Sequence, residues 1–87
     1  MTLYKRTSSF VGARIDDEFV LMSVESGKYF GFGSVGASIW EALNDPISID
    51  SLVNLICDNY EVSEHDCRPD VNAFIEDLVA HKLVSKL

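Results

Sequence analysis

The hydrophobic residues of this 87-residue chain form short runs near its beginning and follow a helical period from residue 35 onward. Runs rich in aromatic and aliphatic residues at 10–15, 19–24 and 28–32 predict three antiparallel β-strands. We expect Asp16-Asp17 to form the first turn and Ser26-Gly27 to form a two-residue hairpin turn, because glycine adopts positive φ at low cost. The first third of the chain is therefore predicted to be a small antiparallel sheet.

The first helix is predicted directly after the third strand. Ser34 is expected to cap it, because a serine hydroxyl group can accept a hydrogen bond from an unpaired backbone N–H. Apolar residues then recur at helical spacing, at Val35, Ile39, Trp40 and Leu43. We expect the turn-forming residues Asn44-Asp45-Pro46 to end the helix.

Two further helices are predicted in the second half of the chain. Ser48 is expected to cap the second, with Asp50 in its first turn and apolar residues on one face at Ile49, Leu52, Val53, Ile56 and Tyr60. Residues 61–66 are acidic and polar without a period, so we expect a loop. The third helix is predicted to begin at Arg68-Pro69-Asp70, since proline suits a first turn, and to bury a stripe made of Val71, Phe74, Ile75, Leu78 and Val79.

Size and composition predict one α+β domain spanning residues 1–87. Hydrophobic residues make up 47% of the chain, which is typical of a folded globular domain. No apolar run has the roughly 18 residues that a membrane span needs. The first residues contain two bases but no apolar segment after them, so we predict no secretory signal and a cytoplasmic location.

The charge balance argues against nucleic acid as a partner. The formal net charge is −7, from fourteen acidic and seven basic residues, and the bases are scattered along the chain. Nucleic-acid binding draws much of its affinity from clustered Lys and Arg. A DNA-binding regulator therefore remains only as an alternative based on fold.

The chain lacks a convincing set of catalytic or metal-ligating residues. Its glycines are not spaced as a nucleotide-binding loop, and His65 and His81 lie far apart in the sequence. Cys57, His65 and Cys67 are candidate zinc ligands, but structural zinc takes four ligands. The preferred interpretation is that Cys57 is a buried thiol on a helix and Cys67 is a thiol in a loop. We also expect the two cysteines to stay reduced rather than form a disulfide. We predict a protein that is not an enzyme and binds no metal or cofactor.

The aromatic third strand is the strongest functional signal. Tyr29 and Gly31 are expected to face one side of the sheet, and Phe30 and Phe32 the other. One interpretation is that all the aromatic residues pack into the core. The other is that an unpaired outer edge accepts an extended peptide as an added strand. The same edge could instead join two copies into a homodimer, although a monomer is the simpler expectation.

Several segments together resemble the PqqD-like family of peptide chaperones and RiPP recognition elements, which bind the leaders of ribosomal precursor peptides. The resemblance covers about residues 10 to 85. It lies in Val20-Leu21-Met22, Gly27-Lys28-Tyr29-Phe30, the first helix with Ile39-Trp40, residues 48–60, and residues 70–78 with Leu83-Val84. The hairpin and the first helix are closer to the stand-alone proteins of lasso-peptide pathways than to the chaperones of quinone-cofactor synthesis.

The resemblance implies a fold and a site. It implies a winged-helix-like arrangement, in which a three-stranded antiparallel sheet is followed by three helices. The leader would add as a strand beside the third strand and lie against the third helix. The implied peptide-binding residues are Lys28, Tyr29, Phe30, Gly31, Phe32, Val71, Phe74, Ile75 and Leu78. The implied partners are a precursor peptide leader and a cysteine-protease-like leader peptidase, or alternatively a radical SAM enzyme.

Overall fold

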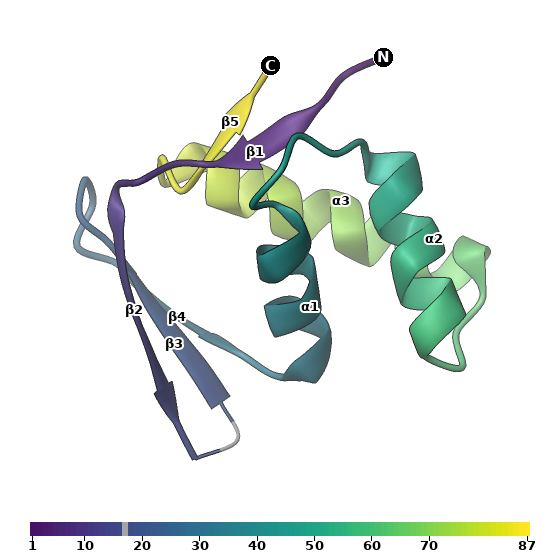
Figure 1. Cartoon of the computed structure of the whole chain (residues 1–87), viewed down its shortest axis with the longest axis horizontal. Coiled ribbons are helices and arrows are strands. Elements are labelled where there is room, and N and C mark those ends of the chain that lie inside the picture. Colours follow the sequence, from purple (N-terminus) through teal and green to yellow (C-terminus); the bar gives the residue numbers. More distant parts are fainter. Residues whose placement is uncertain (17) are drawn as a thin grey trace.

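A three-stranded antiparallel sheet lies beside a group of three helices, and a two-stranded ribbon joins the chain ends (Figure 1). The computed structural model describes residues 1–16 and 18–87. Its elements in chain order are β1 (Tyr4–Arg6), β2 (Phe10–Ile15), β3 (Glu18–Ser23), β4 (Tyr29–Phe32), α1 (Ser34–Ala42), α2 (Ile49–Asn59), α3 (Glu64–Ala80) and β5 (Val84–Lys86). The predicted α+β, winged-helix-like arrangement is confirmed, because the three-stranded sheet of β2, β3 and β4 is followed by the three helices.

The hairpin between β3 and β4 has a longer turn than predicted. The Ser23 N–H donates to the Lys28 carbonyl at 2.9 Å, and the Gly27 N–H donates to the Ser23 carbonyl at 2.7 Å, so residues 24–27 form the turn. The prediction of a two-residue turn at Ser26-Gly27 was wrong. Gly27 does adopt the predicted left-handed conformation, with φ of 72°. In the other predicted turn Asp16 also has positive φ, and Asp17 lies outside the described residues.

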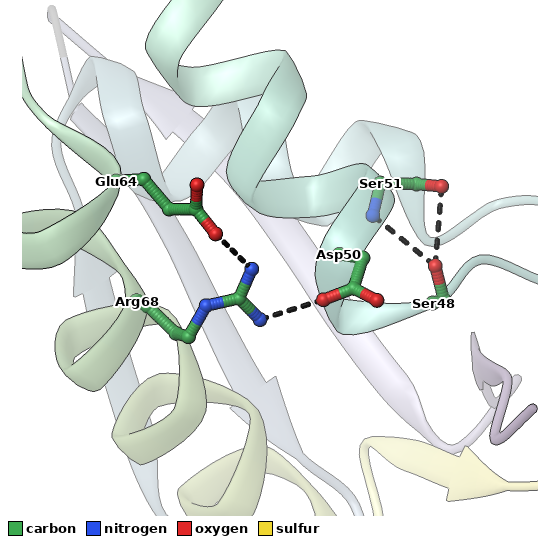
Figure 2. A network of polar contacts seen from close by, with 5 residues as sticks. All are labelled: Ser48, Asp50, Ser51, Glu64 and Arg68. Carbon is green, nitrogen blue, oxygen red and sulfur yellow. Dashed lines mark hydrogen bonds and ion pairs between the residues drawn. The ribbon is translucent and has the colours of Figure 1, made fainter.

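The caps of the first two helices differ from each other. The predicted Ser34 cap was wrong, because Gly33 is the N-cap and Ser34 is already the first helical residue. α1 therefore begins without a side-chain cap. The predicted Ser48 cap of α2 is confirmed, since its hydroxyl oxygen accepts a hydrogen bond from the Ser51 N–H at 3.1 Å (Figure 2). Asp50 lies in the first turn, as predicted.

The third helix begins at Glu64 rather than at the predicted Arg68-Pro69-Asp70 segment, so the predicted loop over residues 61–66 was partly wrong. Ser63 caps this start by accepting a hydrogen bond from the Asp66 N–H at 3.2 Å. Arg68 then pairs with Glu64 one turn earlier and with Asp50 of α2 at 2.7 Å (Figure 2). Pro69 lies inside the helix, where its missing N–H removes one backbone hydrogen bond.

The sequence pattern did not reveal the ribbon at the chain ends. β1 and β5 pair antiparallel, with Tyr4 opposite Lys86 and Arg6 opposite Val84. The Tyr4 N–H also donates to the Ile47 carbonyl at 2.8 Å, which ties the ribbon to the connection between α1 and α2. Strands of three residues carry too little alternation to be recognised in a sequence.

One hydrophobic core joins the sheet to the helices. The most deeply buried side chains come from β3, β4, all three helices and the residues before β5, and include Leu21, Phe32, Trp40, Leu43, Leu52, Val53, Ile75, Leu78 and Leu83. Most residues of the predicted helical stripes face inward, but Val35 of α1 is exposed, and Ile49, Tyr60, Phe74 and Val79 are only half-buried. Among the residues that the structure describes, no helix is long and apolar enough to cross a membrane.

We expect Ser48→Ala to lower the free energy of unfolding by about 1 kcal/mol, because α2 loses its side-chain cap. Chemical denaturation followed by circular dichroism measures the change. Ser48→Thr keeps the capping hydroxyl group without placing a charge at this buried position and is the matched control. Equal losses in both variants would show that the cap does not stabilise α2.

Candidate functional site at the free edge of β4

The pairing of β4 with β3 determines which backbone groups reach the outer edge of the sheet. Ser23 and Lys28 form a hydrogen-bonded pair. In an antiparallel ladder such pairs alternate, so Phe30 opposite Leu21 also directs its N–H and C=O groups toward β3. The intervening residues, Tyr29 and Gly31, direct theirs outward. No described strand pairs with this edge, because β4 is the last strand of the order β2-β3-β4.

The side chains of β4 alternate as predicted. Tyr29 is 68% exposed and Gly31 is exposed, whereas Phe30 is half-buried and Phe32 is 4% exposed. Tyr29 and Gly31 therefore lie on the face that points away from the helices. The strand combines a buried aromatic anchor with an edge that is free to bind.

A groove of about 410 Å³ lies beside the end of β4, between α1, the end of α2 and α3. Its lining is mostly apolar and includes Gly31, Phe32, Ile39, Tyr60, Val71 and Phe74. Asp66 and Asp70 are its charged lining residues, and both are exposed on α3. The free edge and the groove thus form one continuous surface, apolar inside and acidic on the α3 side.

The structure brings most of the predicted site residues to this surface. The Phe74 ring packs edge-on against Phe32, with centroids 5.1 Å apart, and forms the α3 wall of the groove. Val71 also lines the groove although it is 3% exposed. Ile75 and Leu78 lie in the core at 1% and 0% exposure, so they support the wall from behind.

The opposite end of β4 is held against the end of α3. Ser23 is fully buried, and its hydroxyl group donates to the His81 carbonyl at 2.7 Å and accepts from the Ser26 N–H at 3.2 Å. The His81 ring packs edge-on against Phe30 at 5.3 Å, and Lys28 Nζ lies 5.5 Å from the centroid of the same ring. Sequence reasoning missed this connection, because Ser23 and His81 are separated by 58 residues and neither carries a local signal.

Cys57 and Cys67 are both free thiols. Among residues 1–16 and 18–87, no three His, Cys, Asp or Glu side chains are grouped as metal ligands. The prediction of a loop thiol was wrong, because Cys67 is buried in α3, where it lines the groove, and Cys57 is half-buried. Burial raises the pKa of the Cys67 thiol, and the neighbouring Cys57 raises it further, so Cys67 is neutral near pH 7.

Comparison with known proteins identifies the family. The sequence profile of the family described as coenzyme PQQ synthesis protein D (PqqD) matches residues 18–84. The chain therefore belongs to the PqqD family, as its sequence predicted. The search of curated protein sequences gives no match.

Two solved structures share the fold over nearly the whole chain. One is described as TbiB1 in complex with the TbiA(beta) leader peptide, with 33% identity and a TM-score of 0.78 over 93% of this chain and 94% of that one. The other is a lasso peptide synthetase B1 complexed with the leader peptide, with 23% identity and a TM-score of 0.77 over 94% and 96%. The second likeness shows the fold alone.

We expect Ser23→Ala to lower the free energy of unfolding by about 1–3 kcal/mol, because the part-buried His81 carbonyl group and the Ser26 N–H each lose the buried Ser23 hydroxyl group as a partner. Thermal and chemical denaturation measure this change. Ser85→Ala, at an exposed residue of β5, is the control with little expected effect. A loss at Ser23 no larger than that at Ser85 would contradict a structural role for the buried hydroxyl group.

Proposed function

We propose that this chain is a non-catalytic recognition protein that binds the leader segment of a ribosomal precursor peptide and delivers it to a processing enzyme. The leader adds as a strand to the outer edge of β4 and places side chains in the groove against α3. The observation that carries the proposal is the outward orientation of the Tyr29 and Gly31 backbone groups directly beside an apolar groove. Membership of the PqqD family and the likeness to TbiB1 support it.

Backbone pairing alone does not give useful affinity. Each added hydrogen bond contributes about 1 kcal/mol net, and association costs at least about 4 kcal/mol of translational and rotational freedom. Burial of one or more leader side chains has to supply the rest of the binding free energy. The groove beside Phe32 and Phe74 is large enough to hold such an anchor.

The negative charge of the protein favours leader peptides that carry basic residues. The chain carries a formal charge of −7, and Asp66 and Asp70 lie at the groove. A leader with Lys or Arg beside its apolar anchor is therefore favoured, and its association is faster at low salt. The same charge disfavours DNA, and it also opposes the self-association of two copies.

The processing partner follows from the resemblance to lasso-peptide proteins. We assign a cysteine-protease-like leader peptidase as the enzyme that receives the bound leader, with a radical SAM enzyme as the alternative. The likeness to TbiB1 supports leader binding, and the choice of enzyme rests on the sequence resemblance. A precursor gene beside a protease-like gene would support this assignment, and a neighbouring radical-enzyme gene would support the alternative.

The direct test is a titration of the labelled leader from the neighbouring precursor gene, followed by fluorescence anisotropy. We expect saturable one-to-one binding with Kd near ~1 µM or tighter, which corresponds to about −8 kcal/mol. Affinity should fall as salt is raised. Absence of binding at protein concentrations well above ~1 µM would contradict the proposal.

Gly31→Pro tests strand addition itself, when it is compared with Gly31→Ala, which adds a Cβ atom at the same place but keeps the N–H. It removes an outward N–H and leaves the β3 ladder intact, so we expect binding to weaken at least about tenfold with little change in the circular dichroism spectrum. Proline at Phe30 would instead break the ladder to β3. Arg14→Pro is the matched control, because Arg14 directs its N–H outward at the opposite edge, on β2. Full affinity in Gly31→Pro would exclude pairing at this position.

A further inference from the structure

One face of the sheet formed by β2, β3 and β4 is left uncovered by the described residues. The helices lie on one side of the sheet (Figure 1). Phe19, Leu21 and Phe32 belong to the core between the sheet and the helices, so the helices pack on the face that carries them. The opposite face is apolar as well, and large side chains on it remain exposed. Val11 and Ile15 are 58% exposed and Tyr29 is 68% exposed.

The strand register arranges this uncovered face in rows. Residues directly opposite each other share a face of the sheet, so one row runs through Val11, Met22 and Tyr29, and the next runs through Ala13, Val20 and Gly31. The second row becomes shallower toward the free edge because Gly31 has no side chain. A Cβ atom built at Gly31 would have no neighbour within 4 Å. The row therefore ends as an open trough at the edge where a peptide would pair.

An added strand would place one of its side chains over this trough. Gly31 directs its N–H and C=O outward, so it forms a hydrogen-bonded pair with one leader residue, which then lies on the uncovered face. Neighbouring strands are about 4.8 Å apart, so that residue is about two strand spacings from Val20. A long apolar or aromatic side chain can cross Gly31 and contact Val20, as aromatic residues do when they cover a glycine on a neighbouring strand. Tyr29 flanks it on one side.

We propose that Gly31, Val20 and Tyr29 form a second leader subsite, on the face of the sheet opposite the groove, that takes one large apolar or aromatic leader side chain. The inference rests on the proposed function, because an added strand has to supply the side chain. The leader is then recognised on both faces: alternate residues enter the groove, and the residue between them covers Gly31. Gly31 acts as a specificity residue because its missing side chain leaves the space.

A bound leader strand fits this surface better than a second copy of the chain does. The trough opens onto the same edge that pairs with the leader, so strand addition brings a side chain there without any further binding step. A second copy would bring two molecules together that each carry a charge of −7. In such a dimer, the trough of each copy would face the equally shallow trough of the other copy, so no large side chain would fill it.

The test compares alanine scans of the leader against the wild-type protein and against Gly31→Val. Valine suits a strand, keeps the outward N–H and fills the trough. We expect Gly31→Val to bind the intact leader about tenfold more weakly. One leader position should cost about tenfold when changed to alanine in the wild type and less than about twofold in Gly31→Val. Its two neighbours, which face the groove side, should cost the same in both proteins.

Two further variants complete the test, one as a control for a general effect on folding and one as a second probe of the subsite. Ala13→Val adds valine to the same row, but on β2, two strands from the free edge, and should leave leader affinity unchanged. Tyr29→Thr should reduce the cost of alanine at the same leader position that Gly31→Val identifies.

Three results decide the matter. Unchanged affinity of Gly31→Val for the intact leader would overturn the second subsite and leave the proposed function in place. Equal alanine costs at every position in both proteins would do the same. A leader that fails to bind the wild-type protein would overturn the proposed function and this subsite together.

Discussion

The register of β4 on β3 is the constraint on which the rest of the site depends. The Ser23–Lys28 hydrogen bond sets this register, and the alternation of the ladder then assigns each β4 residue a direction for its backbone and a face for its side chain. Phe30 and Phe32 hold the strand to β3 and turn their rings toward the helices. Tyr29 and Gly31 keep both backbone groups free at the edge.

The two ends of β4 are held by different parts of the core, which keeps the edge and α3 in a fixed relation. At one end, the buried Ser23 hydroxyl group joins the hairpin to the His81 carbonyl at the end of α3. At the other end, Phe32 packs against Trp40 of α1 and Phe74 of α3. A groove formed between elements held in this way is largely preformed, so little of the binding free energy is spent on ordering the protein.

The sequence predicted the three strands of the sheet, most of the helical stripes and the family, and the remaining features, including the ribbon of β1 and β5, depend on contacts that no local pattern carries. The turn was predicted two residues too short, yet every β4 side chain lies on its predicted face, because a shift by two residues preserves the alternation. Pro69 suggested a helix start, whereas Ser63 caps α3 five residues before the predicted start. An apolar stripe in the sequence also does not tell which of its residues line the groove and which lie in the core. Phe74 lines the groove and Leu78 is fully buried, because different elements pack over them.

Amide hydrogen exchange along β4, measured by NMR with and without the leader peptide, tests the central claim most directly. In the free protein, the Phe30 and Phe32 amides should exchange slowly because they pair with β3, and the Tyr29 and Gly31 amides should exchange quickly. Saturation with the leader should slow the exchange of Tyr29 and Gly31 and leave the other two protected. Rapid exchange at Tyr29 and Gly31 in the saturated complex would contradict strand addition at this edge.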